Sequence, residues 1–115
     1  MGTEKERDFK INYTFIIKEN FYHNLEQIID YIKIEKQQPI NAVKVGEGII
    51  KTMNKIIDNP LIYTECENIP TKNKTYREAC YKSWLIIFKI ENSQIIILGV
   101  LNRKQKPSIF KKITR

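Results

Sequence analysis

The chain of 115 residues is 42% hydrophobic and 29% charged, with four glycines and four prolines. This composition excludes collagen-like, low-complexity and intrinsically disordered proteins. The length predicts a single domain over residues 1–115, of which residues 1–10 are expected to be flexible. The net charge of +7 is unevenly distributed, because residues 71–115 carry 11 Lys and Arg but two Glu, whereas residues 1–70 have a net charge of −2. The positive C-terminal part favours a polyanion or an acidic protein as partner, although a solvated basic face can also serve solubility alone.

Targeting and redox signals point to the cytoplasm. The segment Met1–Asp8 is too charged for the apolar region of a signal peptide. The longest apolar run, around Ile95–Leu98, is far shorter than the ~18 residues of a membrane span. Cys66 and Cys80 lack the spacing of a metal site, so they are interpreted as reduced structural thiols rather than a disulfide. We expect a cytoplasmic protein with no membrane contact, no metal and no cofactor.

The N-terminal third predicts a strand followed by a helix. Apolar and mostly polar residues alternate from Ile11 to Ile17, with the period of two that is typical of a strand. Asn20 then has the side chain of a helix N-cap. The apolar stripe of an amphipathic helix follows, formed by Phe21, Leu25, Ile28, Ile29 and Ile32.

The next predicted helix lies between two prolines. Pro39 suits the first turn of a helix, and Asn59-Pro60 ends the second apolar stripe. Residues 20–58 therefore predict a helical hairpin. Gly46 and Gly48 each weaken the second helix by up to ~1 kcal/mol relative to Ala, unless they let the two helices approach closely.

The C-terminal half predicts three strands, at about residues 76–82, 84–91 and 94–101, after a loop at 61–75. Asn92-Ser93 is a short hairpin turn between the last two strands. The run Trp84–Phe88 is apolar on both faces, which indicates a central strand covered by helices on at least one side. Residues 107–113 are expected to form a short helix or an ordered tail. The predicted fold class is α+β, with an N-terminal strand, an antiparallel helical hairpin and an antiparallel three-strand meander in one sheet.

Several side chains are candidates for chemistry on RNA. Cleavage through the 2′-oxygen needs cations at the phosphate and groups that move protons. Arg77, Arg103 and Lys104 are candidate cations, and Tyr81 is a weak candidate for proton transfer. The single histidine, His23, lies in the first predicted helix and is interpreted as a surface or packing residue.

Other catalytic motifs are absent from the sequence. It contains no GxSxG, no HExxH and no phosphate-binding glycine loop, and Gly46-Glu47-Gly48 resembles such a loop only superficially. Trp84 has two interpretations, as a base-stacking residue or as a residue of the core or its rim, and its position at the start of a central strand favours the second.

Several segments follow one another in a characteristic order. They are the strand and helix from Tyr13 to Ile32, the second helix from Ala42 to Ile57 with Asn59-Pro60, the sheet segments Tyr76-Arg77 and Trp84–Ile90, and the basic turn Asn102–Pro107. In this order they resemble the RelE/ParE superfamily of toxins from type II toxin–antitoxin (plasmid stabilisation) systems. The similarity covers about residues 11–113, and the long helical hairpin is closer to the ParE branch than to the compact RelE branch.

This resemblance implies a growth-inhibiting toxin with a cognate antitoxin, whose disordered C-terminal segment folds over the hairpin and the sheet. It implies DNA gyrase or ribosome-bound mRNA as the target. RelE-like ribonucleases carry an Arg and a C-terminal Tyr where this chain has Leu85 and Phe110, so we do not expect mRNA cleavage. The alternatives are a ribosome-dependent mRNA endoribonuclease of the same fold and a non-toxic module that binds RNA or protein.

The basic residues that match the superfamily are expected to face the target. They are Arg77, Lys82, Arg103, Lys104 and Lys106. Without its antitoxin the protein is expected to self-associate, because the apolar surface that the partner covers would be exposed.

Overall fold

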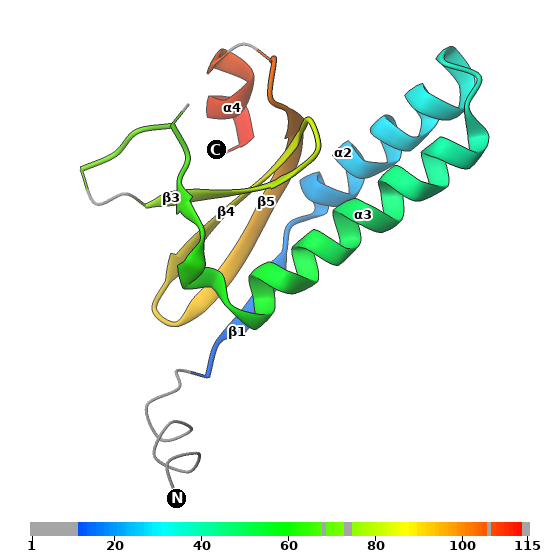
Figure 1. The fold of residues 1–115 in the computed structure, drawn as a ribbon. Helices are drawn as coiled ribbons and strands as arrows, with labels where there is room; N and C mark the ends of the chain where they lie inside the picture. Colours follow the sequence, from blue (N-terminus) through cyan, green and yellow to red (C-terminus); the bar gives the residue numbers. More distant parts are fainter. Residues whose placement is uncertain (1–11, 68, 73–74, 106, 114–115) are drawn as a thin grey trace, which may run out of the picture.

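The computed structural model describes residues 12–67, 69–72, 75–105 and 107–113. One five-stranded sheet has the strand order β1-β5-β4-β3-β2, with a helical hairpin on one face and a short C-terminal helix on the other (Figure 1). This arrangement confirms the predicted α+β fold. The strands are β1 (Thr14–Ile17), β2 (Thr64–Glu65), β3 (Tyr76–Tyr81), β4 (Trp84–Glu91) and β5 (Gln94–Asn102).

The helical hairpin confirms the prediction for residues 20–58. Helix α2 (Glu19–Asp30) continues into the π-helical segment η1 (Tyr31–Glu35), and helix α3 (Pro39–Asp58) returns beside it. Pro39 is the first residue of α3, as predicted. The prediction that Asn20 caps α2 is wrong, because the N-cap is Lys18 and Asn20 lies within the helix. The side chain of Asn20 bonds to the sheet instead, where its Nδ2 donates to the Leu98 carbonyl oxygen at 3.2 Å.

The two glycines of α3 serve different contacts. A Cβ atom at Gly46 would lie 3.0 Å from Cδ1 of Ile29 on α2, so Gly46 permits a close helix–helix approach, which was the alternative to a simple weak point in the helix. Gly48 faces the sheet instead, since a Cβ there would overlap the ring of Tyr81 on β3. At Gly48 the close approach is therefore between α3 and β3, and not between the two helices.

The meander of β3, β4 and β5 is antiparallel and confirms the three predicted strands. Asn92 and Ser93 have φ angles of 51° and 63°, as a tight type I′ hairpin turn requires. β1 pairs in parallel with β5, so that Thr14 lies opposite Gln94. The predicted loop at 61–75 contains the two-residue strand β2, and the 3-10 turn η2 (Pro60–Ile62) precedes it. Both are too short to produce a periodic pattern in the sequence.

Apolar side chains fill both faces of the sheet. Ile86 and Phe88 of β4 pack under the hairpin in the larger core. Leu85 and Ile87 point to the opposite face, where helix α4 (Pro107–Ile113) contributes Phe110 to a second core. The prediction that helices cover the central strand on at least one side is confirmed, since β4 is covered on both. Among the described helices, none is long and apolar enough to cross a membrane.

Candidate functional site

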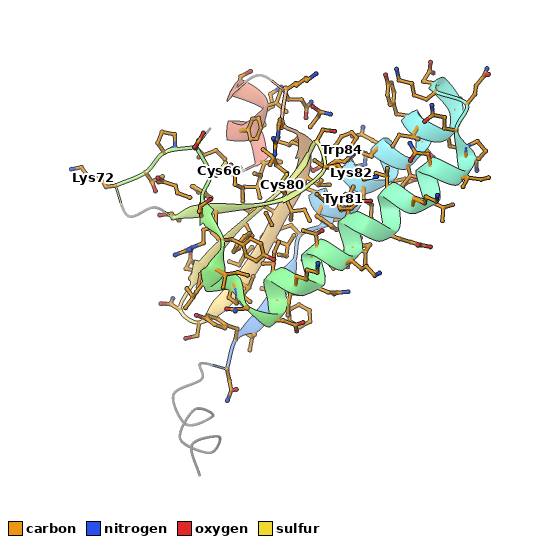
Figure 2. All side chains as sticks on the ribbon, viewed as in Figure 1. Cys66, Lys72, Cys80, Tyr81, Lys82 and Trp84 are labelled. Carbon is orange, nitrogen blue, oxygen red and sulfur yellow. The ribbon has the colours of Figure 1, made fainter. Side chains whose placement is uncertain are left out.

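Three of the predicted target-facing residues gather where β3 turns into β4 and β5 ends. We call Lys82, Arg103 and Lys104 the basic end, and all three are exposed. The Arg103 backbone N–H donates to the Ser83 carbonyl oxygen at 2.8 Å, and its Nη2 donates to Cys80 Sγ at 2.7 Å. The same sulfur donates to the Lys82 carbonyl oxygen at 3.0 Å, so Cys80 links the two cationic segments. Figure 2 labels Cys80, Tyr81, Lys82 and Trp84 at this end of the sheet. Lys106 lies outside the described residues.

Arg77 does not join the basic end. It lies four residues before Tyr81 along β3, a distance of roughly 13 Å at the usual rise of a strand. Its Nη1 donates to the Tyr63 carbonyl oxygen at 2.6 Å, so the guanidinium fastens the segment before β2 to β3. Burial raises the pKa of the Tyr63 phenol above its ordinary value of 10.0, so this side chain is protonated at neutral pH.

Tyr81, the candidate for proton transfer, packs against the helical hairpin. Its ring fills the space that Gly48 leaves open on α3. The ammonium of Lys82 lies 5.6 Å from the centre of the ring, within the range of a cation–π contact. His23 is exposed on α2. The structure therefore brings Tyr81 to the basic end, but as a packing residue.

The two positions where a RelE-like ribonuclease carries an Arg and a Tyr are closed. Leu85 is 3% exposed and Phe110 is fully buried, and both belong to the second core beneath α4. No phosphate can reach either residue without displacing α4. Among the described residues, Arg77, Tyr81 and Arg103 also fail to converge on one point where a reacting phosphate could sit.

The last part of β5 has an edge that β1 does not cover. Leu98 is an extra residue on β5, because Phe88 pairs with Ile97 while Ile87 pairs with Gly99. Beyond this bulge, Asn20 and Asn24 of α2 replace the missing strand. Asn20 donates to the Leu98 carbonyl oxygen, and the Val100 N–H donates to Asn24 Oδ1 at 3.2 Å. The side chains of α2 thus hold the helix beside the edge of β5.

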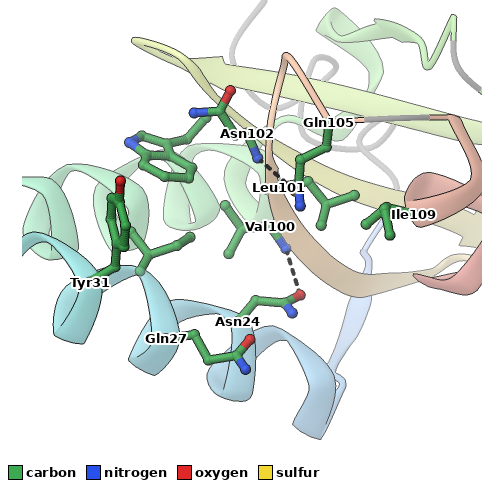
Figure 3. A pocket seen from close by; sticks show the side chains of 10 residues that line it. Asn24, Gln27, Tyr31, Val100, Leu101, Asn102, Gln105 and Ile109 are labelled. Carbon is green, nitrogen blue, oxygen red and sulfur yellow. Dashed lines mark hydrogen bonds between the residues drawn. The ribbon is translucent and has the colours of Figure 1, made fainter. Parts of the chain in front are cut away.

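A pocket opens between α2 and this edge of β5. Its volume is about 450 Å³, within the range of small-molecule sites. Figure 3 shows Asn24, Gln27 and Tyr31 on the helix side, facing Asn102 and Gln105 on the side of β5 and the following turn. We call it the amide pocket, and its lining residues are Asn24, Gln27, Ile28, Tyr31, Trp84, Val100, Leu101, Asn102, Gln105 and Ile109. Trp84 thus lies at the rim of the core, as favoured from the sequence, and also lines a cavity.

Sequence reasoning did not predict this pocket. Amide side chains have no spacing rule that marks a site, and the pocket forms only where the bulge in β5 meets α2. The one available signal was the helical spacing of Asn24, Gln27 and Tyr31, which lie on one face of α2 and its continuation η1, beside the buried stripe.

A second depression lies on the outer face of the hairpin. We call it the hairpin groove, with a volume of about 590 Å³, and it is lined by Leu25, Ile29, Val43, Gly46, Glu47, Ile50 and Lys51. Val43 is 58% exposed, and Ile40, earlier on the same helix, is 74% exposed. The described part of the chain therefore presents an apolar groove along two helices, away from the sheet.

The family model described as "ParE toxin of type II toxin-antitoxin system, parDE" matches residues 15–107. The chain belongs to the ParE toxin family. It is the toxin component of a type II toxin–antitoxin system, and the closer resemblance to the ParE branch is thereby confirmed. The match extends from β1 to the start of α4, so it includes the hairpin groove, the basic end and most of the amide pocket.

Solved structures of two toxin–antitoxin systems share the fold. A chain of the chromosomal ParDE system from P. aeruginosa is 14% identical with a TM-score of 0.63, over 81% of this chain and 98% of that chain. A chain of the RelBE2 toxin–antitoxin complex from Mycobacterium tuberculosis is also 14% identical, with a TM-score of 0.52 over 81% and 100% of the two chains. A search of curated proteins found no significant match.

Proposed function

We propose that an antitoxin neutralises this ParE-family toxin by laying an amphipathic helix into the hairpin groove. An apolar channel between two antiparallel helices is the surface that such a helix recognises. Val43 and Ile50 line the groove from α3, and Leu25 and Ile29 line it from α2. Each would lose contact with water on binding, and the surrounding exposed residues would contribute the polar rim.

A strand of the antitoxin would add to the open edge of the sheet. β1 pairs with β5 on one side, and among the described residues no strand pairs with its other side. Phe15 and Ile16 of β1 are both exposed, one on each face. An extended apolar peptide could bond to this edge through its backbone and cover both side chains. The net charge of +9 on residues 71–115 would attract an acidic antitoxin during the encounter.

The toxin would act in the cytoplasm on an essential target other than mRNA, with DNA gyrase as the first candidate. The alternative is ribosome-dependent cleavage of mRNA, in which the ribosome with its mRNA would be the target. The single observation that carries this proposal is the burial of Leu85 and Phe110 in the second core. With those two positions closed, cleavage would lack a preorganised cation and a hydroxyl. The loss of each costs on the order of 10² in rate. The basic end remains available to contact a target.

Induced expression in growing cells tests the basic end and the hairpin groove separately. The double substitution of Arg103→Ala and Lys104→Ala should abolish growth arrest while the purified protein still binds its antitoxin. The matched control replaces Lys33 and Lys36, which are exposed at the tip of the hairpin, and should leave the arrest unchanged. The double substitution of Val43→Asp and Ile50→Asp in the hairpin groove should have the opposite effect. The variant should still arrest growth, and co-expression of the antitoxin should no longer restore growth. If the basic-end variant still arrests growth, the target surface lies elsewhere.

A further inference from the structure

The amide pocket presents hydrogen-bond donors. Three of its four amide oxygens already accept a bond: Asn24 Oδ1 from the Val100 N–H, Asn102 Oδ1 from the Lys104 N–H at 2.9 Å, and Gln105 Oε1 from the Asn102 N–H at 3.2 Å. No described residue accepts a hydrogen bond from the NH2 groups of these side chains. The side chain of Gln27 bonds to none of the described residues. A ligand of this pocket therefore supplies acceptors.

The side of the pocket formed by the turn after β5 favours a ligand with negative charge, whereas on the helix side Asp30 and Glu35 lie in an adjoining depression that shares Gln27 and Tyr31. No Asp or Glu belongs to the lining of the amide pocket itself. Arg103 and Lys104 lie in the turn between two lining residues, Asn102 and Gln105, and both are exposed. Lys104 makes no ion pair with any described residue, so its ammonium is available to a phosphate.

Two aromatic side chains complete the pocket. Tyr31 is 50% exposed at the start of the π-helical segment η1, and Trp84 is half-buried at the start of β4. Both belong to the lining, together with apolar Ile28 and Ile109. An exposed aromatic ring beside a donor-rich cavity is suited to stacking against a flat ring that carries nitrogen and oxygen acceptors.

We propose that the amide pocket binds a nucleotide. The base stacks against Tyr31 or Trp84, the amide NH2 groups donate to its acceptor edge, and Lys104 and Arg103 hold the phosphate. An acidic peptide would use the cations but would leave the aromatic walls without a partner. The site is separate from the hairpin groove, so it does not depend on the proposed antitoxin contact. Binding here involves no cleavage, and the nucleotide is either a free mononucleotide or an unpaired residue of a nucleic-acid strand.

The fluorescence of Trp84 reports on this site alone, because Trp84 is the single tryptophan of the chain. The purified full chain is titrated with AMP, GMP, CMP and UMP, and with ribose 5-phosphate and inorganic phosphate as ligands without a base. We expect saturable quenching by at least one nucleotide and none by the two controls. Calorimetry on the same samples measures affinity without the fluorophore. No saturable binding of any nucleotide, or equal binding of ribose 5-phosphate, would overturn the proposal.

Matched variants locate the binding. Tyr31→Ala and Gln27→Ala each remove an exposed side chain of the pocket, and we expect Tyr31→Ala to weaken nucleotide affinity roughly tenfold or more. Tyr22→Ala is the control, since Tyr22 is 49% exposed on α2, which continues into η1, and lies outside the pocket. Circular dichroism checks that all variants fold. Nucleotide binding that Tyr31→Ala and Gln27→Ala leave unchanged would place the site elsewhere and overturn the assignment.

Two further arms identify the source of the nucleotide and test the rival ligand. If single-stranded oligonucleotides bind more tightly than the mononucleotide, the natural ligand is a residue within a nucleic-acid strand. If they bind equally or more weakly, it is a free nucleotide. Both outcomes support recognition of a base and a phosphate in this pocket. An acidic tetrapeptide is the comparison ligand. If the peptide binds with dependence on Tyr31 while no nucleotide does, the pocket is a peptide site and the proposal fails.

Discussion

Arg77 illustrates how a residue suited to phosphate chemistry serves packing instead. Its guanidinium donates to the Tyr63 carbonyl oxygen and lies away from the basic end. Arg77→Ala removes a partly buried bond to a charged donor, so we expect the free energy of unfolding in urea to fall by about 1.5–3 kcal/mol. Growth arrest per folded molecule should not change. A variant with normal stability that no longer arrests growth would contradict this packing role and indicate that Arg77 contacts the target.

A second prediction concerns the stability cost of adding a single Cβ atom at Gly48. Ala is normally the better residue within a helix by about 1 kcal/mol. A Cβ at Gly48 would overlap the ring of Tyr81, so we expect Gly48→Ala to destabilise the protein by about 1–3 kcal/mol. Thermal unfolding measures the change. Gly46→Ala is the control and should cost less, because its Cβ meets the flexible end of Ile29. A Gly48→Ala cost that persists in a Tyr81→Ala background would rule out the proposed clash.

Among the elements, α4 covers Leu85 and buries its own Phe110, and we propose that it thereby prevents RNA cleavage. Phe110 anchors α4 in the second core, which leaves no room for a catalytic tyrosine at this position. Phe110→Tyr would restore the hydroxyl of a RelE-like enzyme, but we expect a loss of about 1–3 kcal/mol in stability, because the buried hydroxyl lacks a partner. Chemical denaturation and an in vitro mRNA cleavage assay are the two measurements. Cleavage gained by this single substitution would show that α4 does not close the site.

The elements differ in how well the sequence predicts them. The hairpin follows from apolar stripes with a period of 3.6, and the meander follows from apolar runs of strand length that are separated by turn residues. Their limits were therefore predicted to within one or two residues. β2 was not predicted, because a strand of two residues cannot show an alternation of apolar and polar side chains. Asn20 was misassigned because its N-cap preference is a local property, whereas its bonds reach a strand 78 residues away in the sequence. Of the candidate site, the structure places Arg103 near Lys82, and their contact with a target stays a prediction. The amide pocket depends on the bulge at Leu98, which no local pattern marks.

Across the molecule, exposed apolar side chains lie on the hairpin, on the open edge of the sheet at β1 and on the turn η2. They are Phe15, Ile16, Tyr22, Tyr31, Ile34, Ile40, Val43, Leu61 and Ile62. Because monomeric proteins rarely expose large apolar patches, we expect the isolated toxin to self-associate at micromolar to millimolar concentrations. Light scattering should report this association. Replacing Val43 and Ile50 with Lys should reduce it, and a clean monomer at all concentrations in the unmodified protein would contradict it.

We propose that this ParE-family toxin arrests growth without cutting mRNA. Primer extension on translated transcripts, made after induction and before cell death, tests it most directly. We predict full growth arrest with no codon-phased cuts above the uninduced control, since Leu85 and Phe110 are buried and Arg77 is held by Tyr63. Strong codon-phased cuts that disappear in the Arg77→Ala variant would contradict the claim and identify the protein as a ribosome-dependent ribonuclease.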